Sequence, residues 1–203
     1  MDPPAMTLYA EALATFSDLF AQARAAGIPE PTAMTVATAT PGGQPSARMA
    51  LLKAHDERGF VFYTHLDGRK GRELQANPQC ALLFFWKALG DDGVQVRVEG
   101  EVEIVDDAEA DAYFAMRPRD SQLGAWASHQ SETLENRETF EQRFEEAKLR
   151  YEGGDVPRPP RWGGFRVKPR SIEFWYGAQF RLHERHLYER GADGQWTKRM
   201  LYP

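Results

Sequence analysis

"GVQVRVEGEVEIV", residues 93–105, alternates apolar and polar side chains along most of its length. This alternation is typical of a β-strand with one buried face, and it predicts that Val94, Val96 and Val98 face the core. Gly100 interrupts the pattern and indicates a bulge or a bend. The stretch therefore favours a sheet whose inner face is covered by the rest of the chain.

Further strand patterns lie on both sides of this stretch. Apolar and β-branched runs separated by turn residues precede it at 33–40, 47–53, 60–65 and 80–86, and three more follow between residue 163 and the end. The pattern predicts a small antiparallel barrel of about seven strands, in which the first and last strands can share one sheet.

Helical patterns flank and interrupt the strands. An amphipathic helix is expected at about 7–26 with Gly27 as its stop, and a short one before Pro78. A helical insertion is expected at about 107–152, with a helix over its last part from residue 132. We therefore expect a single domain over residues 1–203, mainly β with flanking helices (α+β).

The composition excludes several classes of protein. The chain has 203 residues and a net charge of −5, which argues against general affinity for nucleic acid. Its one cysteine, Cys80, cannot form a disulfide within the chain, and we expect no metal site. The start of the chain does not resemble a secretory signal, and no apolar run approaches the roughly 20 residues of a membrane span. We expect a cytoplasmic protein that binds neither membrane nor nucleic acid.

Four cations surround the strands at 47–65. Arg48 and Lys53 bracket the first of them, and regular alternation would put the two on opposite faces unless a bulge intervenes. Arg69 and Lys70 begin the short helix, where positive charge opposes the helix dipole unless an anion is bound. The four residues indicate either one or two phosphate sites or a solvated turn.

Two later clusters have a similar character. The first, within residues 113–131, combines Arg and hydroxyl side chains that suit a phosphate dianion, although a helix end with local salt bridges would look alike. The second contains Arg181, His183 and Arg185, which would share one face of a regular strand because they are two positions apart, close to Trp175 in sequence. The alternative interpretation is a solvated edge strand.

Side chains that perform chemistry alone are scarce in this sequence. It contains no H-E-x-x-H, no G-x-S-x-G and no Walker loop. Anion-binding and aromatic residues are plentiful, which is typical of an enzyme whose bound cofactor carries out the difficult step.

The chain resembles the pyridoxine (pyridoxamine) 5′-phosphate oxidase family from Pro31 to Pro203. The motifs that carry the resemblance are "PTAMTVAT", "RMALLK", "FVFYT", "GRKGREL", "RPRDSQLGAWASHQS", "WGGFRV", "IEFW", "RLHER" and "RMLYP", in this order. The resemblance implies an FMN-binding split β-barrel and a homodimer with FMN at the interface between the subunits.

The same resemblance implies a set of site residues. The residues implied for FMN are Arg48, Met49, Ala50, Leu51, Leu52, Lys53, Tyr63, Thr64, Arg69, Lys70, Gln95, Gln130, Ser131, Trp175 and Arg185, the last two reaching in from the other subunit. Those implied for the substrate are Lys53, Tyr113, Arg117 and Ser121 at its phosphate, and Arg181 and His183 at its ring, where they would be the catalytic pair. Arg48 would thus serve FMN, and Lys53 mainly the substrate.

The implied reaction is hydride transfer from substrate C4′ to flavin N5, followed by reoxidation with O2 to give H2O2. The substrates would be pyridoxine 5′-phosphate and pyridoxamine 5′-phosphate, and the product pyridoxal 5′-phosphate. Two alternatives remain: a related FMN oxidase of another pathway, such as a phenazine type, and a flavin- or vitamin B6-binding protein without turnover. The complete phosphate set argues against the first alternative, and the complete "RLHER" motif against the second.

Overall fold

A computed structural model describes residues 7–203 of the chain. The first six residues, on which the expected absence of a secretory signal partly depends, lie outside the described residues. Within residues 7–203, none of the helices has the length and apolar character needed to cross a membrane.

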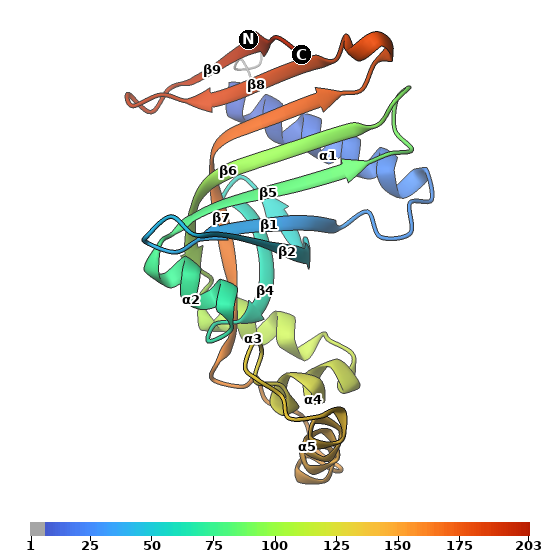
Figure 1. The fold of residues 1–203 in the computed structure, drawn as a ribbon, viewed down its shortest axis with the longest axis vertical. Coiled ribbons are helices and arrows are strands. Elements are labelled where there is room, and N and C mark those ends of the chain that lie inside the picture. Colours follow the sequence, from blue (N-terminus) through green and yellow to red (C-terminus); the bar gives the residue numbers. More distant parts are fainter. Residues whose placement is uncertain (1–6) are drawn as a thin grey trace, which may run out of the picture.

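The described residues contain nine strands that form one antiparallel sheet (Figure 1). The strands are β1 (Ala33–Ala39), β2 (Pro45–Leu51), β3 (Ala54–Asp56), β4 (Gly59–His65), β5 (Gln79–Trp86), β6 (Val94–Ile104), β7 (Trp162–Tyr176), β8 (Glu184–Arg190) and β9 (Trp196–Leu201). Their order is β2-β1-β5-β6-β7-β4-β3, and β8 and β9 continue from β7. The sheet curls into a half-barrel, so the expected antiparallel fold class is confirmed, with nine strands in place of about seven.

The strand β7 organises the sheet. It pairs with β6 along one edge, while its other edge pairs first with β4 and then with β8. Val94, Val96 and Val98 of β6 are buried as predicted. The register between β6 and β7 shifts at Gly100, where a Cβ atom would lie 2.0 Å from the Lys168 carbonyl oxygen, so the predicted bulge is confirmed.

The helix α1 (Leu8–Ala25) covers the inner face of the sheet. It begins at Thr7, whose side chain accepts a hydrogen bond from the Ala10 amide, and it is followed by Gly27 with φ 69°, as the sequence predicted. Its buried Phe16 contacts the rings of Phe60 and Phe84, which come from opposite parts of the sheet. The helix thereby closes the open side of the half-barrel.

The other helices lie around one end of the sheet. They are α2 (Arg69–Ala76), α3 (Asp107–Ala115), α4 (Arg119–Ala127) and α5 (Arg137–Arg150). The last three form the expected insertion, which Figure 1 shows at the end of the molecule opposite β8 and β9. The helix expected from residue 132 begins only at Arg137, because the Asn136 side chain caps the Thr139 amide there.

Two strand predictions are wrong. Lys53 lies beyond the end of β2, so alternation along that strand says nothing about its position relative to Arg48. Likewise β8 begins at Glu184, and the residues before it form a tight turn in which Phe180 and Arg181 have φ 58° and 64°. Arg181 and His183 therefore do not share a strand face with Arg185.

Candidate functional site

A cavity of about 610 Å³ lies between the sheet and the helical insertion. The end of β2 and the outer face of β4 form one wall, the start of α2 another, and the α3–α4 connection a third. Strand alternation puts Tyr63 and His65 on the face opposite the buried Phe62, and Thr64, between them, also lines the cavity at the end of the strand. The cavity thus lies where elements distant in sequence converge.

Aromatic rings form the floor of the cavity. Tyr63 of β4 stacks on Tyr113 of α3 at 4.0 Å between centroids, and Trp162 lies 5.4 Å from Tyr63 in a nearly parallel plane. The Arg117 guanidinium lies 4.7 Å above the Trp162 ring. These flat faces and the cation beside them suit an aromatic ligand that carries negative charge.

Three cations line the cavity: Lys53, Lys70 and Arg117. Lys70 Nζ donates to Thr64 Oγ1 at 2.9 Å and to Gln130 Oε1 at 2.7 Å, and burial followed by the charge of Arg48 lowers the Lys70 pKa to about 8. Arg117 Nη1 is buried and has no hydrogen-bond partner among residues 7–203. A buried donor without a partner costs free energy unless a ligand satisfies the group, so the cavity favours an anion.

Eleven residues predicted from the sequence line this cavity. They are Met49, Ala50, Leu51, Lys53, Tyr63, Thr64, Lys70, Tyr113, Arg117, Ser121 and Gln130. All four residues expected at the substrate phosphate belong to this set, although Lys53 is distant in sequence from the other three.

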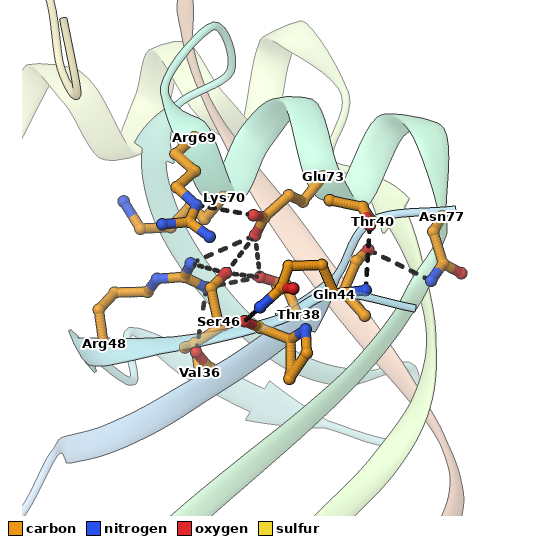
Figure 2. A network of polar contacts seen from close by, with 12 residues as sticks. Val36, Thr38, Thr40, Gln44, Ser46, Arg48, Arg69, Lys70, Glu73 and Asn77 are labelled. Atoms are coloured by element: carbon orange, nitrogen blue, oxygen red, sulfur yellow. Dashed lines mark hydrogen bonds and ion pairs between the residues drawn. The ribbon is translucent and has the colours of Figure 1, made fainter. Parts of the chain in front are cut away.

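Arg48 and Arg69 lie beside the cavity and both contact a buried carboxylate, Glu73 (Figure 2). Glu73 accepts hydrogen bonds from Arg69 at 2.9 Å, from Ser46 at 2.5 Å, and from Thr38, and it lies 3.3 Å from Arg48. Burial alone would raise the Glu73 pKa, but the bonds from Ser46, Thr38 and the two arginines outweigh it and lower the pKa to about 2. Both guanidinium groups are therefore held in place by an ionised carboxylate.

A second group of predicted residues lies where the start of β6, the end of β7 and the start of β8 are neighbours. Gln95, Trp175 and Arg185 are cross-strand neighbours there, and the His183 ring lies 4.5 Å from Trp175. His183 Nδ1 accepts a hydrogen bond from the Ala178 amide at 3.1 Å, which orients the imidazole. Arg181 precedes His183 by two positions, and none of these residues lines the cavity of its own chain.

Two predicted residues belong to neither group. Leu52 is buried in the hydrophobic core, and Ser131 lies at φ 71° in the connection after α4, where it lines a separate hollow. The backbone at Ser131 is in the left-handed region, which is strained for a serine.

Sequence reasoning missed His65 and Trp162, which both line the cavity. His65 is 5% exposed, and its Nδ1 has no hydrogen-bond partner among the described residues. Burial, followed by the charge of Arg161, lowers the pKa of His65 to about 4, so the imidazole is neutral at pH 7. The alternation of β4 was the available signal, because it puts His65 on the same face as Tyr63.

The described residues contain no group of three or more His, Cys, Asp or Glu side chains that could hold a metal ion.

Two family models match this chain. Residues 20–151 match the model described as pyridoxamine 5′-phosphate oxidase, and residues 162–203 match the pyridoxine 5′-phosphate oxidase C-terminal dimerisation region. A pyridoxine/pyridoxamine 5′-phosphate oxidase of Xanthomonas euvesicatoria pv. vesicatoria is 61% identical over 97% of this chain and 98% of its own. One from Xylella fastidiosa is 60% identical over 98% and 95%.

Solved structures share the fold. PhzG from Burkholderia lata 383, in complex with tetrahydrophenazine-1-carboxylic acid, superposes with a TM-score of 0.88 at 33% identity, covering 100% of this chain and 95% of its own. A pyridoxamine 5′-phosphate oxidase-related, FMN binding protein from Nostoc punctiforme PCC 73102 has a TM-score of 0.73 at 16% identity, over 93% and 97% of the two chains, which shows the fold alone.

Proposed function

Because the chain belongs to the pyridoxamine 5′-phosphate oxidase family, we propose that it oxidises pyridoxine 5′-phosphate and pyridoxamine 5′-phosphate to pyridoxal 5′-phosphate. Family membership makes the chain an oxidoreductase with FMN as its cofactor. The observation that carries the choice of substrate is the cavity, in which Lys53, Arg117 and Ser121 can hold a phosphate next to a floor of aromatic rings.

The residues around α2 fit an FMN phosphate. The helix begins at Gly68 with no side-chain cap and no acidic residue in its first turn, which leaves its first amide groups for an anion. Lys70 faces the cavity there, and Glu73 holds Arg48 and Arg69 close by. We assign these three cations to the cofactor phosphate.

FMN supplies the acceptor for the hydride that leaves substrate C4′ and, once reduced, the electrons that convert O2 to H2O2. The chain's own residues bind and orient the substrate. Lys53, Tyr113, Arg117 and Ser121 hold its phosphate, while His183 is the side chain best suited to accept a proton.

The site requires a second protomer. The C-terminal dimerisation region supports a homodimer, and the group formed by Gln95, Trp175 and His183 lies within or next to that region, away from its own cavity. We assign Trp175, Arg181, His183 and Arg185 to the cavity of the partner. The large exposed apolar side chains beside them, Phe180 and Tyr202, support this assignment.

The similarity to PhzG favours a second candidate, oxidation of a reduced phenazine precursor. We rank it lower, because the relatives named as phosphate-ester oxidases are about twice as similar in sequence (61% against 33%) and because a phenazine carries no phosphate for Lys53 and Arg117.

An aerobic assay of the FMN-loaded protein tests the proposal. We expect pyridoxal 5′-phosphate and H2O2 in equal amounts from pyridoxine 5′-phosphate, and a KM higher by about 100-fold or more for pyridoxine, which lacks the phosphate and its several charge-assisted hydrogen bonds. Equal activity toward pyridoxine, or turnover of tetrahydrophenazine-1-carboxylic acid alone, would contradict it.

A further inference from the structure

Two arginines make close contacts with the acidic side chains of α3, and a third, Arg58, lies 3.7 Å from Glu109. Arg166 of β7 is 3% exposed, and its Nη2 lies 2.7 Å from both carboxylate oxygens of Glu109. Arg158, in the segment before β7, binds Asp107 at 2.6 Å and Asp111 at 2.5 Å. Asp107 and Asp111 are four positions apart and lie on one face of α3, whereas Glu109 lies between them on another face. The two arginines therefore hold α3 from two directions.

The contacts of Arg166 extend into the sheet. Its guanidinium also lies 3.3 Å from Asp56 of β3 and 3.7 Å from Glu103 of β6. Arg158 Nη1 donates to the carbonyl oxygen of Trp162, the residue whose ring forms part of the cavity floor. Both arginines therefore connect α3 to strands that are fixed by the core.

Residues in α3 and directly after it form part of the cavity wall. Tyr113 follows Glu109 by one helical turn on the same face, and its ring stacks on Tyr63. Arg117 follows two residues after the end of α3. The helix has only nine residues and buries only Ala110 and Phe114, and a helix of this length is not stable by itself in water. Its position must come from contacts made with the rest of the chain.

We propose that Arg158 and Arg166 are positioning residues, which place Tyr113 and Arg117 for the substrate phosphate by holding the carboxylates of α3. The inference rests on the proposed function, since it gives these arginines a role in substrate binding. Neither arginine lines the cavity, and neither forms a hydrogen bond or ion pair with Arg48, Arg69 or Lys70, the residues assigned to the FMN phosphate. Their loss should therefore change substrate affinity and leave cofactor affinity as it is.

The variants are chosen so that folding does not obscure the result. Arg166 is 3% exposed and contacts Asp56, Glu103 and Glu109 together, so replacing it would remove several contacts at once. Glu109→Gln removes only the Glu109 charge. Arg158→Met removes the second contact, and its partners Asp107 and Asp111 are largely exposed and can be hydrated. Arg158→Lys keeps the charge, so its KM for pyridoxine 5′-phosphate should stay close to that of the wild type. Asn136→Ala, which removes the cap of α5, is the control for a general loss of stability.

We expect KM for pyridoxine 5′-phosphate to rise about tenfold in Glu109→Gln and about threefold in Arg158→Met, as for the partial loss of one charge-assisted hydrogen bond. We expect kcat and the Kd of FMN to change less than about twofold in both variants, and KM to be unchanged in Asn136→Ala. An unchanged KM in both variants, or a fall in kcat at constant KM, would overturn the proposal.

A second measurement is independent of turnover. In protein without FMN, near-ultraviolet circular dichroism reports the stack of Tyr63, Tyr113 and Trp162. We expect its amplitude to decrease in Glu109→Gln and Arg158→Met but not in Asn136→Ala. An identical spectrum in all variants would contradict the inference, whereas a wild-type protein that fails to oxidise phosphate substrates would contradict only the proposed function.

Discussion

The buried imidazole of His65 makes the protein sensitive to acid. Arg161, Lys70 and Arg117 face it with positive charge and Asp67 with negative charge, and burial together with these groups lowers its pKa from 6.5 to about 4. The unfolded chain therefore binds the proton more readily. The free energy of unfolding falls as the pH decreases from about 6.5 to about 4, by roughly 3 kcal/mol over this window.

A single substitution tests this pH dependence. We expect His65→Gln to flatten the pH profile of the unfolding free energy between about pH 6.5 and 4, because glutamine has no proton to bind in this range. Denaturant unfolding of the protein without FMN at several pH values measures the difference between the two profiles. Parallel profiles for wild type and variant would show that His65 titrates normally.

Lys53 and Arg48 should affect different ligands. Lys53 lines the cavity, while Arg48 lies beside it and contacts Glu73. We expect Lys53→Ala to raise KM for pyridoxine 5′-phosphate about 10- to 100-fold with near-normal FMN affinity, and Arg48→Ala to weaken FMN by a similar factor. Quenching of flavin fluorescence on titration into the two proteins without cofactor measures the second effect. Equal losses of FMN affinity in both variants would assign both residues to one phosphate.

The sequence motifs predicted the cavity residues better than alternation did. Lys53, Tyr113 and Arg117 meet as the resemblance implied, but parity failed for Lys53 because β2 ends two residues before it. The contact of Arg48 with Glu73 spans 25 positions, and no local pattern predicts which carboxylate a partly buried arginine will contact. Partners of this kind are decided by tertiary packing.

At the scale of the elements, the glycine inside α2 determines how closely this helix approaches the strand before it. A Cβ atom on Gly71 would lie 2.2 Å from the Leu66 carbonyl oxygen and 2.7 Å from that of His65, whereas one on Gly124 of α4 would meet nothing within 4 Å. These two helical glycines therefore form a matched pair.

We expect Gly71→Ala to lower the free energy of unfolding by about 1–3 kcal/mol and to weaken FMN binding, because α2 must move away together with Lys70. Gly124→Ala should raise the free energy of unfolding by up to about 1 kcal/mol, as alanine favours a helix. Thermal and denaturant unfolding of both variants measures the difference. Equal changes in the free energy of unfolding would mean that the close approach at Gly71 does not contribute to stability.

The elements were predictable where local chemistry marks their ends. Gly27 marks the end of α1 and Gly100 the bulge in β6, and both were found where expected. The turn before β8 was not, because its left-handed positions are occupied by Phe180 and Arg181, two residue types that rarely adopt this conformation. The alternating pattern therefore predicted a strand that starts earlier than β8 does.

At the scale of the whole molecule, we propose that two exposed apolar side chains form part of the surface through which two protomers associate. Phe180 is 88% exposed and Tyr202 is 94% exposed, and both belong to the C-terminal dimerisation region. We expect the double variant Phe180→Asp and Tyr202→Asp to shift the protein toward a monomer that loses FMN, because charges at a contact would have to be desolvated. Leu149→Asp, at a 70% exposed leucine on α5, is the control.

Sedimentation velocity with detection at the flavin absorbance measures both properties at once. We expect the control to remain a yellow dimer. A double variant that also remains dimeric would place the contact elsewhere, and a monomer that retains FMN in full would contradict a cofactor site shared by two subunits.

The position of β7 in the chain has a consequence for biosynthesis. β7 is the strand that connects β6 to β4, and its synthesis begins after about four-fifths of the chain has been made. Until then the edge of β6 offers unpaired amide and carbonyl groups to neighbouring nascent chains. A message cut short before codon 162 would thus encode most of the cavity's residues and yet yield an aggregation-prone fragment, with no residual enzyme for a cell to use.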